Sequence, residues 1–556
     1  MLSTSNEAGA TDDYETLYQG FHWHVPPDFS IAQLCAGRWA GDAGRIAILY
    51  EDDAGHASTT TYAELWHDAR RLAQALRRHG VARGDRVAIV LPQRPETAVA
   101  HIACHLLGAV AMPLSILFGP EALAYRLQDS AAVLAIIDQA AAAALAEIRA
   151  DCPALKRVLG AGCDSELDWD AELAQSDGDI AAVATAASDP AILIYTSGTT
   201  GAPKGALGSH RNMTSNILSA GYAAARTYLR RGETPPDPVP RTMLTVIPMF
   251  HCTACSAGMM GAVATGTTTI FMRRWDAVRA MEIIERERVQ MTGGVPTIAW
   301  QLLEHPDRAK YDLSSLDTIA YGGAPSAPEL VKRIHEEFGA LPGNGWGMTE
   351  TMATVTTHGG EDYLNRPTSA GPPVATADLE IRADDGVTVL PTGEVGELWA
   401  RGPMIVKGYW NKPEATAATF VDGWVRTGDL ARLDDEGFLY VVDRAKDMVI
   451  RGGENIYSTE VENVLYAHPA VTDCALIGVP HRSLGEEPAA VVHLAPGMSA
   501  TEEELKVWVR ERLAAFKTPV AIRFVADTLP RNANGKILKK DLKILFEEPA
   551  QTSDAR

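Results

Sequence analysis

A loop rich in glycine and hydroxyl residues, Tyr195-Thr-Ser-Gly-Thr-Thr-Gly-Ala-Pro-Lys-Gly205, directly follows an apolar run. Its glycines let the backbone turn N–H groups toward an anion, its hydroxyls add donors, and Lys204 adds positive charge. The Gly-x4-Gly-Lys-Ser/Thr spacing of a Walker A loop is absent. We therefore expect a phosphate-binding loop of another kind. The same composition, taken alone, is also typical of a flexible Ser/Gly linker.

A second cluster, Asn344-Gly-Trp-Gly-Met-Thr-Glu350, brings an aromatic ring, a hydroxyl and a carboxylate close together in the chain. Trp346 is suited to stack on a nucleotide base, Thr349 to donate to a phosphate, and Glu350 to hold a Mg²⁺ ion. Each has a plainer alternative, because a tryptophan is often a core residue and a glutamate near a helix start is often solvated.

Two further segments carry charge at turns. Trp424-Val-Arg-Thr-Gly-Asp429 ends in a carboxylate that can accept both hydroxyl protons of a ribose, and Arg444 follows after one hairpin. The alternative for this pair is a surface ion pair, which contributes little to stability. Near the C-terminus, Pro530-Arg-Asn-Ala-Asn-Gly-Lys536 ends in one lysine, although Asn-Gly-Lys is commonly only a hairpin tip.

The elements that must position these residues follow an α/β pattern. Short aliphatic runs alternate with Ala/Leu-rich helical segments through the first four hundred or so residues, which indicates βα units around buried parallel strands. The clearest pairs are 86–91 with 96–107, 133–137 with 140–149, and 268–271 with 277–287.

From Gly393 the runs become short, alternating and punctuated by glycine, which predicts smaller antiparallel sheets. After Arg444, helical segments 458–467 and 501–515 flank strand-like segments 472–479 and 489–494, as in an α+β domain. We place an N-terminal domain at 1–443, a hinge at 444–446, a C-terminal domain at 447–546 and a tail at 547–556.

Composition excludes some classes of protein. The chain has 556 residues, 46% hydrophobic, with 50 Lys plus Arg against 71 Asp plus Glu and a formal charge of -21. Such a surface offers no general nucleic-acid footprint, and an anionic ligand needs a local cationic site. Seven thinly spread cysteines fit a reducing compartment. Without a second ligand cluster, Cys252 and Cys255 beside His251 are expected to form a packed apolar turn and not a zinc site.

The N-terminus is acidic and lacks the basic start and apolar core of a signal peptide, so we expect a cytoplasmic protein. Residues 97–119 contain no Asp, Glu, Lys or Arg but include two histidines, a glycine and a proline. We expect a buried helix to about Leu107 and then a short strand, not a transmembrane segment.

Taken in order, YTSGTTGAPKG, GWGMTE and WVRTGD resemble the acyl-adenylate-forming superfamily, which includes acyl-CoA synthetases, aryl-CoA ligases, firefly luciferase and nonribosomal adenylation domains. The resemblance covers residues 20 to 545. It implies an acid:CoA ligase with ATP, Mg²⁺ and coenzyme A as cofactors. It also implies a large N-terminal domain with a β-barrel-like subdomain and a mobile C-terminal domain.

The resemblance assigns roles residue by residue. The residues that resemble the family's phosphate loop are Thr196, Ser197, Gly198, Thr199, Thr200, Gly201 and Lys204. The nucleoside pocket is similar at Gly323, Ala324, Pro325, Asn344, Trp346, Asp429 and Arg444, where Trp346 replaces the usual tyrosine and keeps the stacking but not a phenol hydrogen bond. Catalytic positions match Thr349, the Mg²⁺ residue Glu350, the lysine Lys536 and the acyl-pocket gate His251. From the residues alone, a satisfied core histidine is the favoured interpretation of His251.

The remaining assignments concern the hinge, the thiol and the acid. Lys446 matches the hinge residue, and Gly452 and Gly453 resemble the loop that closes over the pantetheine arm. Small residues at Thr253, Ala257, Gly322 and Gly347 imply an open acyl pocket, so we expect a medium- or long-chain fatty acid, with aryl or polycyclic acids as the alternative. For Gly347, the plainer role is to let the backbone turn.

Two other functions remain open from the sequence. An acyl-AMP ligase would hand its intermediate to a carrier-protein thiol instead of coenzyme A. A catalytically idle nucleotide sensor would keep the fold without using Lys536. The quaternary state, a homodimer included, is not determined by the sequence.

Overall fold

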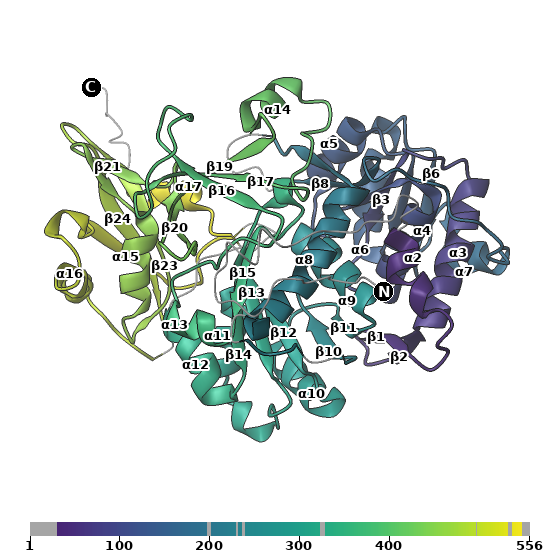
Figure 1. Ribbon diagram of the computed structural model, residues 1–556, viewed down its shortest axis with the longest axis horizontal. Helices are drawn as coiled ribbons and strands as arrows, with labels where there is room; N and C mark the ends of the chain where they lie inside the picture. The colour runs from purple at the N-terminus through teal and green to yellow at the C-terminus, as the bar shows by residue number, and fades with distance from the viewer. Residues whose placement is uncertain are drawn as a thin grey trace, which may run out of the picture.

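The computed structural model describes residues 31–196, 202–229, 232–235, 239–322, 328–495, 497–531 and 536–546. The α/β class is confirmed, with two large βα-built sheets, one small antiparallel sheet and a C-terminal α+β unit (Figure 1). The predicted tail at 547–556 lies outside the described residues. None of the helices in the described ranges has both the length and the apolar character needed to cross a membrane.

The first large sheet has seven strands, parallel except for its last pair. Its inner strands are short aliphatic runs buried on both faces, as parallel strands covered by helices must be. In spatial order they are β7 (Leu167–Asp168), β6 (Arg157–Gly160), β5 (Leu134–Ile137), β3 (Arg86–Val90), β4 (Val110–Pro113), β8 (Pro190–Tyr195) and β9 (Gly205–Ser209).

The second large sheet has eight strands, antiparallel only at its two edges. In spatial order they are β15 (Thr356–Gly359), β14 (Leu341–Trp346), β13 (Thr318–Gly322), β12 (Met291–Gly294), β10 (Thr242–Thr245), β11 (Thr268–Met272), β1 (Ile46–Glu51) and β2 (Ala57–Thr61).

Helices fill three layers around these sheets. Buried residues of the middle layer contact both sheets and come from α2 (Ile31–Cys35), α3 (Tyr62–Arg78), α4 (Pro95–Leu107), α8 (His210–Leu229) and α9 (Gly261–Thr265). The outer face of the first sheet carries α5 (Pro120–Ser130) and α6 (Gln139–Ile148). The outer face of the second sheet carries α10 (Ala277–Glu287), α11 (Pro296–Glu304) and α12 (Pro328–Phe338). Shorter helices are α7 (Trp169–Ala174), α13 (Glu361–Asn365) and α14 (Pro413–Thr419).

The charge-free stretch at 97–119 is α4 followed by β4, as expected. Pro95 begins the helix, where its missing N–H costs nothing, and Gly108 ends it in the left-handed region at φ 64°. Every residue of α4 from Thr97 to Leu107 is buried, which explains its apolar sequence.

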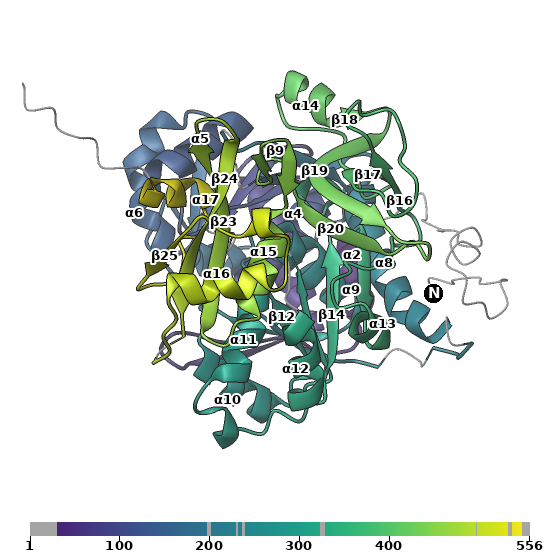
Figure 2. The same ribbon diagram turned by 90° about the vertical axis from the view of Figure 1, so that its left-hand side faces the viewer.

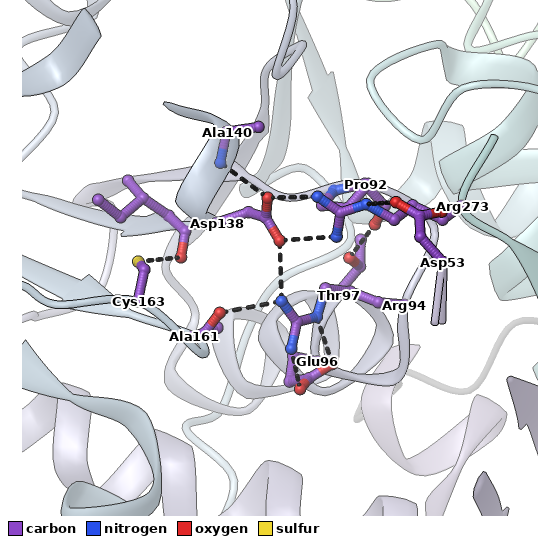
Figure 3. A network of polar contacts seen from close by, with 11 residues as sticks. Asp53, Pro92, Arg94, Glu96, Thr97, Asp138, Ala140, Ala161, Cys163 and Arg273 are labelled. Atoms are coloured by element: carbon purple, nitrogen blue, oxygen red, sulfur yellow. Dashed lines mark hydrogen bonds and ion pairs between the residues drawn. The ribbon is translucent and has the colours of Figure 1, made fainter. Parts of the chain in front are cut away.

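A buried ion network joins the two large sheets (Figure 3). The Asp138 carboxylate, 2% exposed, accepts from both terminal nitrogens of Arg273, at 2.8 and 3.0 Å, and from Arg94 Nη1 at 2.9 Å. Arg94 follows β3, Asp138 follows β5, and Arg273 follows β11 of the other sheet. The network therefore fixes the carboxyl ends of the two sheets relative to each other, and ligand-binding loops of open α/β sheets lie at such ends.

The small sheet contains β16 (Asp378–Arg382), β17 (Gly396–Arg401), β18 (Phe420–Val421), β19 (Trp424–Leu433) and β20 (Leu439–Arg444), all antiparallel as predicted. The chain then enters the C-terminal unit, which we define as residues 449–546. It contains β21 (Val449–Arg451), β22 (Glu454–Ile456), β23 (Val471–His481), β24 (Gly485–Leu494) and β25 (Ala521–Val525).

Helices α15 (Ser458–Tyr466), α16 (Glu502–Arg510) and α17 (Lys539–Leu542) complete this unit, which lies across the body of the molecule in Figure 2. The predicted helix 501–515 is too long. A Thr501–Glu504 capping box starts it as expected, but it ends at Arg510, before a separate short 3₁₀ turn at Ala515–Lys517. The domain boundary at 444–446 stays a prediction.

Candidate active site

A cavity of about 4070 Å³ opens between the body and the C-terminal unit. Its lining contains most of the described residues that the sequence singled out: Thr196, Lys204, His251, Thr253, Ala257, Gly322, Asn344, Trp346, Gly347, Thr349, Glu350, Asp429, Arg444, Lys446 and Lys536. These residues come from both large sheets, the small sheet and the C-terminal unit. The fold thus gathers segments that are far apart in the sequence into one space.

The predicted phosphate loop is closed at its base by two hydrogen bonds. Thr196 N–H donates to the Lys204 carbonyl at 2.9 Å, and Lys204 N–H donates to Thr196 Oγ1 at 3.1 Å. The intervening candidates Ser197, Gly198, Thr199, Thr200 and Gly201 lie outside the described residues, as do Gly323, Ala324 and Pro325. The described ends already place Lys204 at the carboxyl end of the first sheet.

Glu350 lies in a tight turn that follows β14. The turn is a 3₁₀ segment, Thr349–Thr351, and the next two residues, Met352 and Ala353, have φ of 50° and 111°, which is strained backbone for non-glycine residues. Asn216 of α8 holds this turn, because its Oδ1 accepts from Thr354 N–H at 2.8 Å. The surrounding structure therefore fixes the direction of the Glu350 carboxylate.

Gly347 lies against the backbone of the next turn, and its expected role in the acyl pocket stays a prediction. A Cβ built on Gly347 would lie 1.4 Å from the Ala353 carbonyl oxygen and 3.2 Å from Thr354 Cα. A side chain here would therefore collide with the backbone that positions Glu350. Gly347 does line the cavity, but the close backbone approach accounts for the glycine without any reference to the acid.

Asp429 and Trp346 are joined directly. Asp429 is 2% exposed, and its Oδ2 accepts from the Trp346 indole Nε1 at 2.8 Å. Arg444 Nε lies 2.5 Å from Asp429 Oδ1, but their orientation makes no hydrogen bond, so this buried oxygen keeps an acceptor site. Burial raises the pKa of Asp429, and the Arg444 charge opposes the rise. The indole N–H of Trp346, at the position where the resembled family usually has a tyrosine, thus orients this carboxylate.

Asn344 uses its amide locally. Its Oδ1 accepts from Gly345 N–H at 2.8 Å, and its Nδ2 donates to the Ser369 carbonyl at 3.4 Å. The amide thus ties β14 to the segment before the small sheet. A contact between Asn344 and a base stays a prediction.

His251 and Lys536 are both partly buried at the cavity, and the Lys536 charge acts on His251. Burial, and then the Lys536 charge, lower the pKa of His251 to about 4. Nδ1 of this neutral imidazole accepts from Thr253 N–H at 3.2 Å, so Nε2 carries the proton and is a donor suited to a carboxylate oxygen. Burial, followed by the Arg444 charge, lowers the pKa of Lys536.

The candidate acyl-pocket residues Thr253 and Ala257 lie on a π-helix, Thr253–Met260, directly after His251. Helices of this kind are rare and occur frequently at functional sites. Gly322 ends β13, and a Cβ there would meet only the Gly345 carbonyl oxygen at 3.2 Å. Cys255 lies on the same π-helix, and Cys252 just precedes it; both are buried, as in a packed apolar turn.

Gly452 and Gly453 are the described candidates that do not line the cavity. They form the two-residue loop of the β21–β22 hairpin, where Arg451 pairs with Glu454, and their φ values are 59° and 91°. This turn type requires left-handed residues, so the hairpin itself accounts for both glycines. Their contact with a pantetheine arm stays a prediction.

Sequence reasoning missed Tyr409. Its hydroxyl donates to Glu350 Oε1 at 2.5 Å, and Lys204 Nζ lies 4.6 Å from the centroid of its ring. The only signal was an aromatic pair, Tyr409-Trp410, after a glycine in a segment between two predicted strands.

Comparison with known proteins identifies the family. The AMP-binding enzyme family matches residues 36–410, and its C-terminal domain matches residues 460–536. A feruloyl-CoA synthase of Amycolatopsis is 38% identical, covering 88% of this chain and 95% of that protein. A long-chain-fatty-acid–CoA ligase of Mycobacterium tuberculosis is 35% identical, covering 87% of this chain and 92% of that protein. The structure of the Bacillus subtilis o-succinylbenzoate CoA synthetase with ATP and magnesium aligns with a TM-score of 0.78 at 32% identity, covering 91% and 98%.

Proposed function

Because this chain belongs to the AMP-binding enzyme family and is an ATP-dependent acid–thiol ligase, we propose that it activates a fatty acid in two steps. In the first step the carboxylate attacks the α-phosphorus of ATP, which forms acyl-AMP and releases pyrophosphate. In the second, the thiol of coenzyme A attacks the acyl carbonyl and AMP leaves. The observation that carries the proposal is the single cavity lined by Lys204, Glu350, Asp429 and Lys536.

The residues present fit ATP and Mg²⁺. Asp429 Oδ1 is a buried acceptor without a hydrogen-bond partner in the described part of the chain, which suits a ribose hydroxyl. The Glu350 carboxylate, 7% exposed, is held through Oε1, so Oε2 is the oxygen for a hard cation. Mg²⁺ bound there would neutralise phosphate charge.

The first step brings two anions together, so catalysis should depend on position and on positive charge. Lys204 faces the phosphates from the loop, and Lys536 supplies charge as pyrophosphate leaves. Neutral His251 donates from Nε2 to the acid carboxylate without adding a charge of its own. No side-chain nucleophile is needed.

The second step needs the thiol to reach a carbonyl that Lys536 and the C-terminal unit now cover. We propose that this unit rotates about residues 444–446, which withdraws the lysine and brings the 452–453 hairpin to the site. The present arrangement, with Lys536 at the cavity, corresponds to the first step.

A medium- or long-chain fatty acid is the substrate we favour. Support comes from the small side chains of Thr253 and Ala257 and from Gly322, which line the same cavity as His251. The relatives named above include a ligase for long-chain fatty acids and one for a hydroxycinnamic acid, so the acid has to be measured.

Isotopic exchange of pyrophosphate into ATP tests the proposal. The exchange should require an acid and Mg²⁺ but not coenzyme A, and thioester should form only when the thiol is added. Straight-chain acids from acetate to palmitate, with ferulate as the aryl comparison, give kcat/KM against chain length. Exchange without thioester formation would point to a carrier-protein acceptor, and ATP binding without exchange would point to the idle sensor.

A further inference from the structure

The segment that contains Tyr409 is attached to both halves of the candidate phosphate site. Trp410 N–H donates to the Gly205 carbonyl at 2.7 Å, and Leu207 N–H donates to the Gly408 carbonyl at 3.2 Å. Residues 408–410 therefore run alongside β9, the strand that leaves the phosphate loop. On the other side, Val406 N–H donates to the Glu350 carbonyl at 2.9 Å.

The Tyr409 side chain lies between two opposite charges. Its ring is 8% exposed, with the Lys204 ammonium over the face and the Glu350 carboxylate at the hydroxyl. Burial and Glu350 raise the pKa of Tyr409 well above its usual range, so the hydroxyl remains a donor. In the described part of the chain, Lys204 and Glu350 make no ion pair with each other.

A direct Lys204–Glu350 pair would be harmful to a site that handles ATP. It would neutralise the charge intended for phosphate and occupy the oxygens intended for a cation. A tyrosine ring prevents the pair while attracting the ammonium to its face, and its hydroxyl fixes one carboxylate oxygen.

We propose that Tyr409 is a positioning residue, whose hydroxyl turns Glu350 toward the divalent cation and whose ring holds Lys204 apart from that carboxylate and available to phosphate. The inference rests on the proposed function, since it assumes that ATP and Mg²⁺ bind in this cavity. It adds Tyr409 to the site and assigns separate roles to its hydroxyl and to its ring.

The two halves of Tyr409 can be separated by substitution. Tyr409→Phe removes the hydroxyl and keeps the ring, whereas Tyr409→Leu removes both. Tyr62→Phe is a matched control, because Tyr62 is also buried and its hydroxyl donates, to the Thr267 carbonyl at 2.8 Å, without touching Glu350. Melting temperatures of all three variants report their general loss of stability.

Isothermal titration calorimetry of ATP binding, with Mg²⁺ and with EDTA, is the deciding measurement, supported by the Mg²⁺ dependence of pyrophosphate exchange. For Tyr409→Phe we expect metal-free ATP affinity within about twofold of wild type and a half-saturating Mg²⁺ concentration raised about tenfold, the size of one charge-assisted hydrogen bond. For Tyr409→Leu, metal-free affinity should also fall, by about fivefold.

The inference is overturned if Tyr409→Phe leaves the Mg²⁺ requirement unchanged, or if Tyr62→Phe raises it equally. It is also overturned if both Tyr409 variants lose metal-free ATP binding to the same extent, because the ring would then have no separate role. A wild-type protein that neither binds ATP nor exchanges pyrophosphate would contradict the proposed function itself, which is a different result.

Discussion

Lys536 brings a positive charge into a cavity that already contains Arg444, and burial together with that neighbour lowers the pKa of its ammonium. Keeping Lys536 charged here is unfavourable, so its ammonium is useful only where negative charge develops. In the proposed reaction that happens when pyrophosphate leaves, and not when the thiol attacks.

Replacing Lys536 with alanine should therefore separate the two steps. Pyrophosphate exchange is expected to fall by about 10² to 10³, the range for one preorganised donor, while thioester formation from supplied acyl-AMP is largely retained. Wild-type exchange should also decline as pH rises through the lowered pKa of the lysine, at a lower pH than an ordinary lysine would give. Equal losses in both steps would contradict the role assigned to Lys536.

Gly347 gives a second prediction at this scale. Because a single methyl at this position overlaps the Ala353 carbonyl, Gly347→Ala should displace the turn that fixes Thr349 and Glu350. We expect kcat/KM to fall about tenfold or more for every acid, from acetate to palmitate. A selective loss of long acids would instead return Gly347 to the acyl pocket.

At the scale of elements, the strand β20 and the helix α15 meet at a buried carboxylate. Asp443, 4% exposed, accepts from the backbone N–H and the Oγ of Ser458, the latter at 2.9 Å. Lys539 Nζ in turn donates to Ser458 Oγ at 2.8 Å and pairs with Glu462 at 2.7 Å. Asp443 thus connects the small sheet to the segment that carries Lys536, three residues before Lys539.

Asp443→Ala should weaken the arrangement that places Lys536 at the cavity. We expect pyrophosphate exchange to fall about tenfold, with thioester formation from acyl-AMP unchanged or faster. Thr501→Ala is the control, because it removes a helix-capping side chain inside the C-terminal unit without crossing to the body. The melting temperature of Thr501→Ala should fall, while the ratio of its exchange rate to its thioester-forming rate stays that of wild type. If Thr501→Ala shifts this ratio as Asp443→Ala does, then Asp443 acts only through the stability of the fold.

The predicted hinge can be tested on the same two rates. Proline fixes φ near −65° and restricts the residue before it, so Lys446→Pro should hinder rotation of the C-terminal unit. Pyrophosphate exchange should persist while turnover with coenzyme A falls. If both rates drop together, Lys446 supports the fold and the hinge lies elsewhere.

At the scale of the whole molecule, the middle helical layer contains three buried histidines. The ring centroid of His105 lies 6.4 Å from that of His101 and 5.9 Å from that of His210. The ring nitrogens of all three have no hydrogen-bond partner in the described part of the chain. Burial lowers the pKa of His101 and of His210 to about 4 and holds that of His105 well below its usual range. Folding therefore requires all three rings to be neutral.

This cluster predicts acid lability. Between pH 6.5 and about 4 the unfolded chain binds protons that the folded chain does not, so stability is full above that window and declines as pH falls through it. Urea unfolding at pH 7 and pH 5, followed by tryptophan fluorescence, measures the change. His101→Leu should reduce the loss between the two pH values by about 2 kcal/mol. An unchanged loss would mean that His101 already has a partner for its charged form.

The sequence by itself determined the class of fold and the order of the candidate segments, and most of the described candidate residues that it named line the cavity. Helix α10 begins and ends where its pattern predicted, because periodicity, an Asp276 cap and the end of the apolar stripe are all local signals. The glycine-rich and charged motifs were recognisable for the same reason, since each is a short run of residues with one chemistry.

Only the tertiary structure decided which side chains meet. Tyr409 reaches Glu350 across 59 residues because residues 408–410 lie beside β9, and the Trp346–Asp429 hydrogen bond joins two sheets. The Ala353 carbonyl lies where a Cβ of residue 347 would be, and residues 452–453 form a hairpin turn. Contacts of this kind depend on strand order and on the crossing of distant segments, and no local pattern in the chain encodes them.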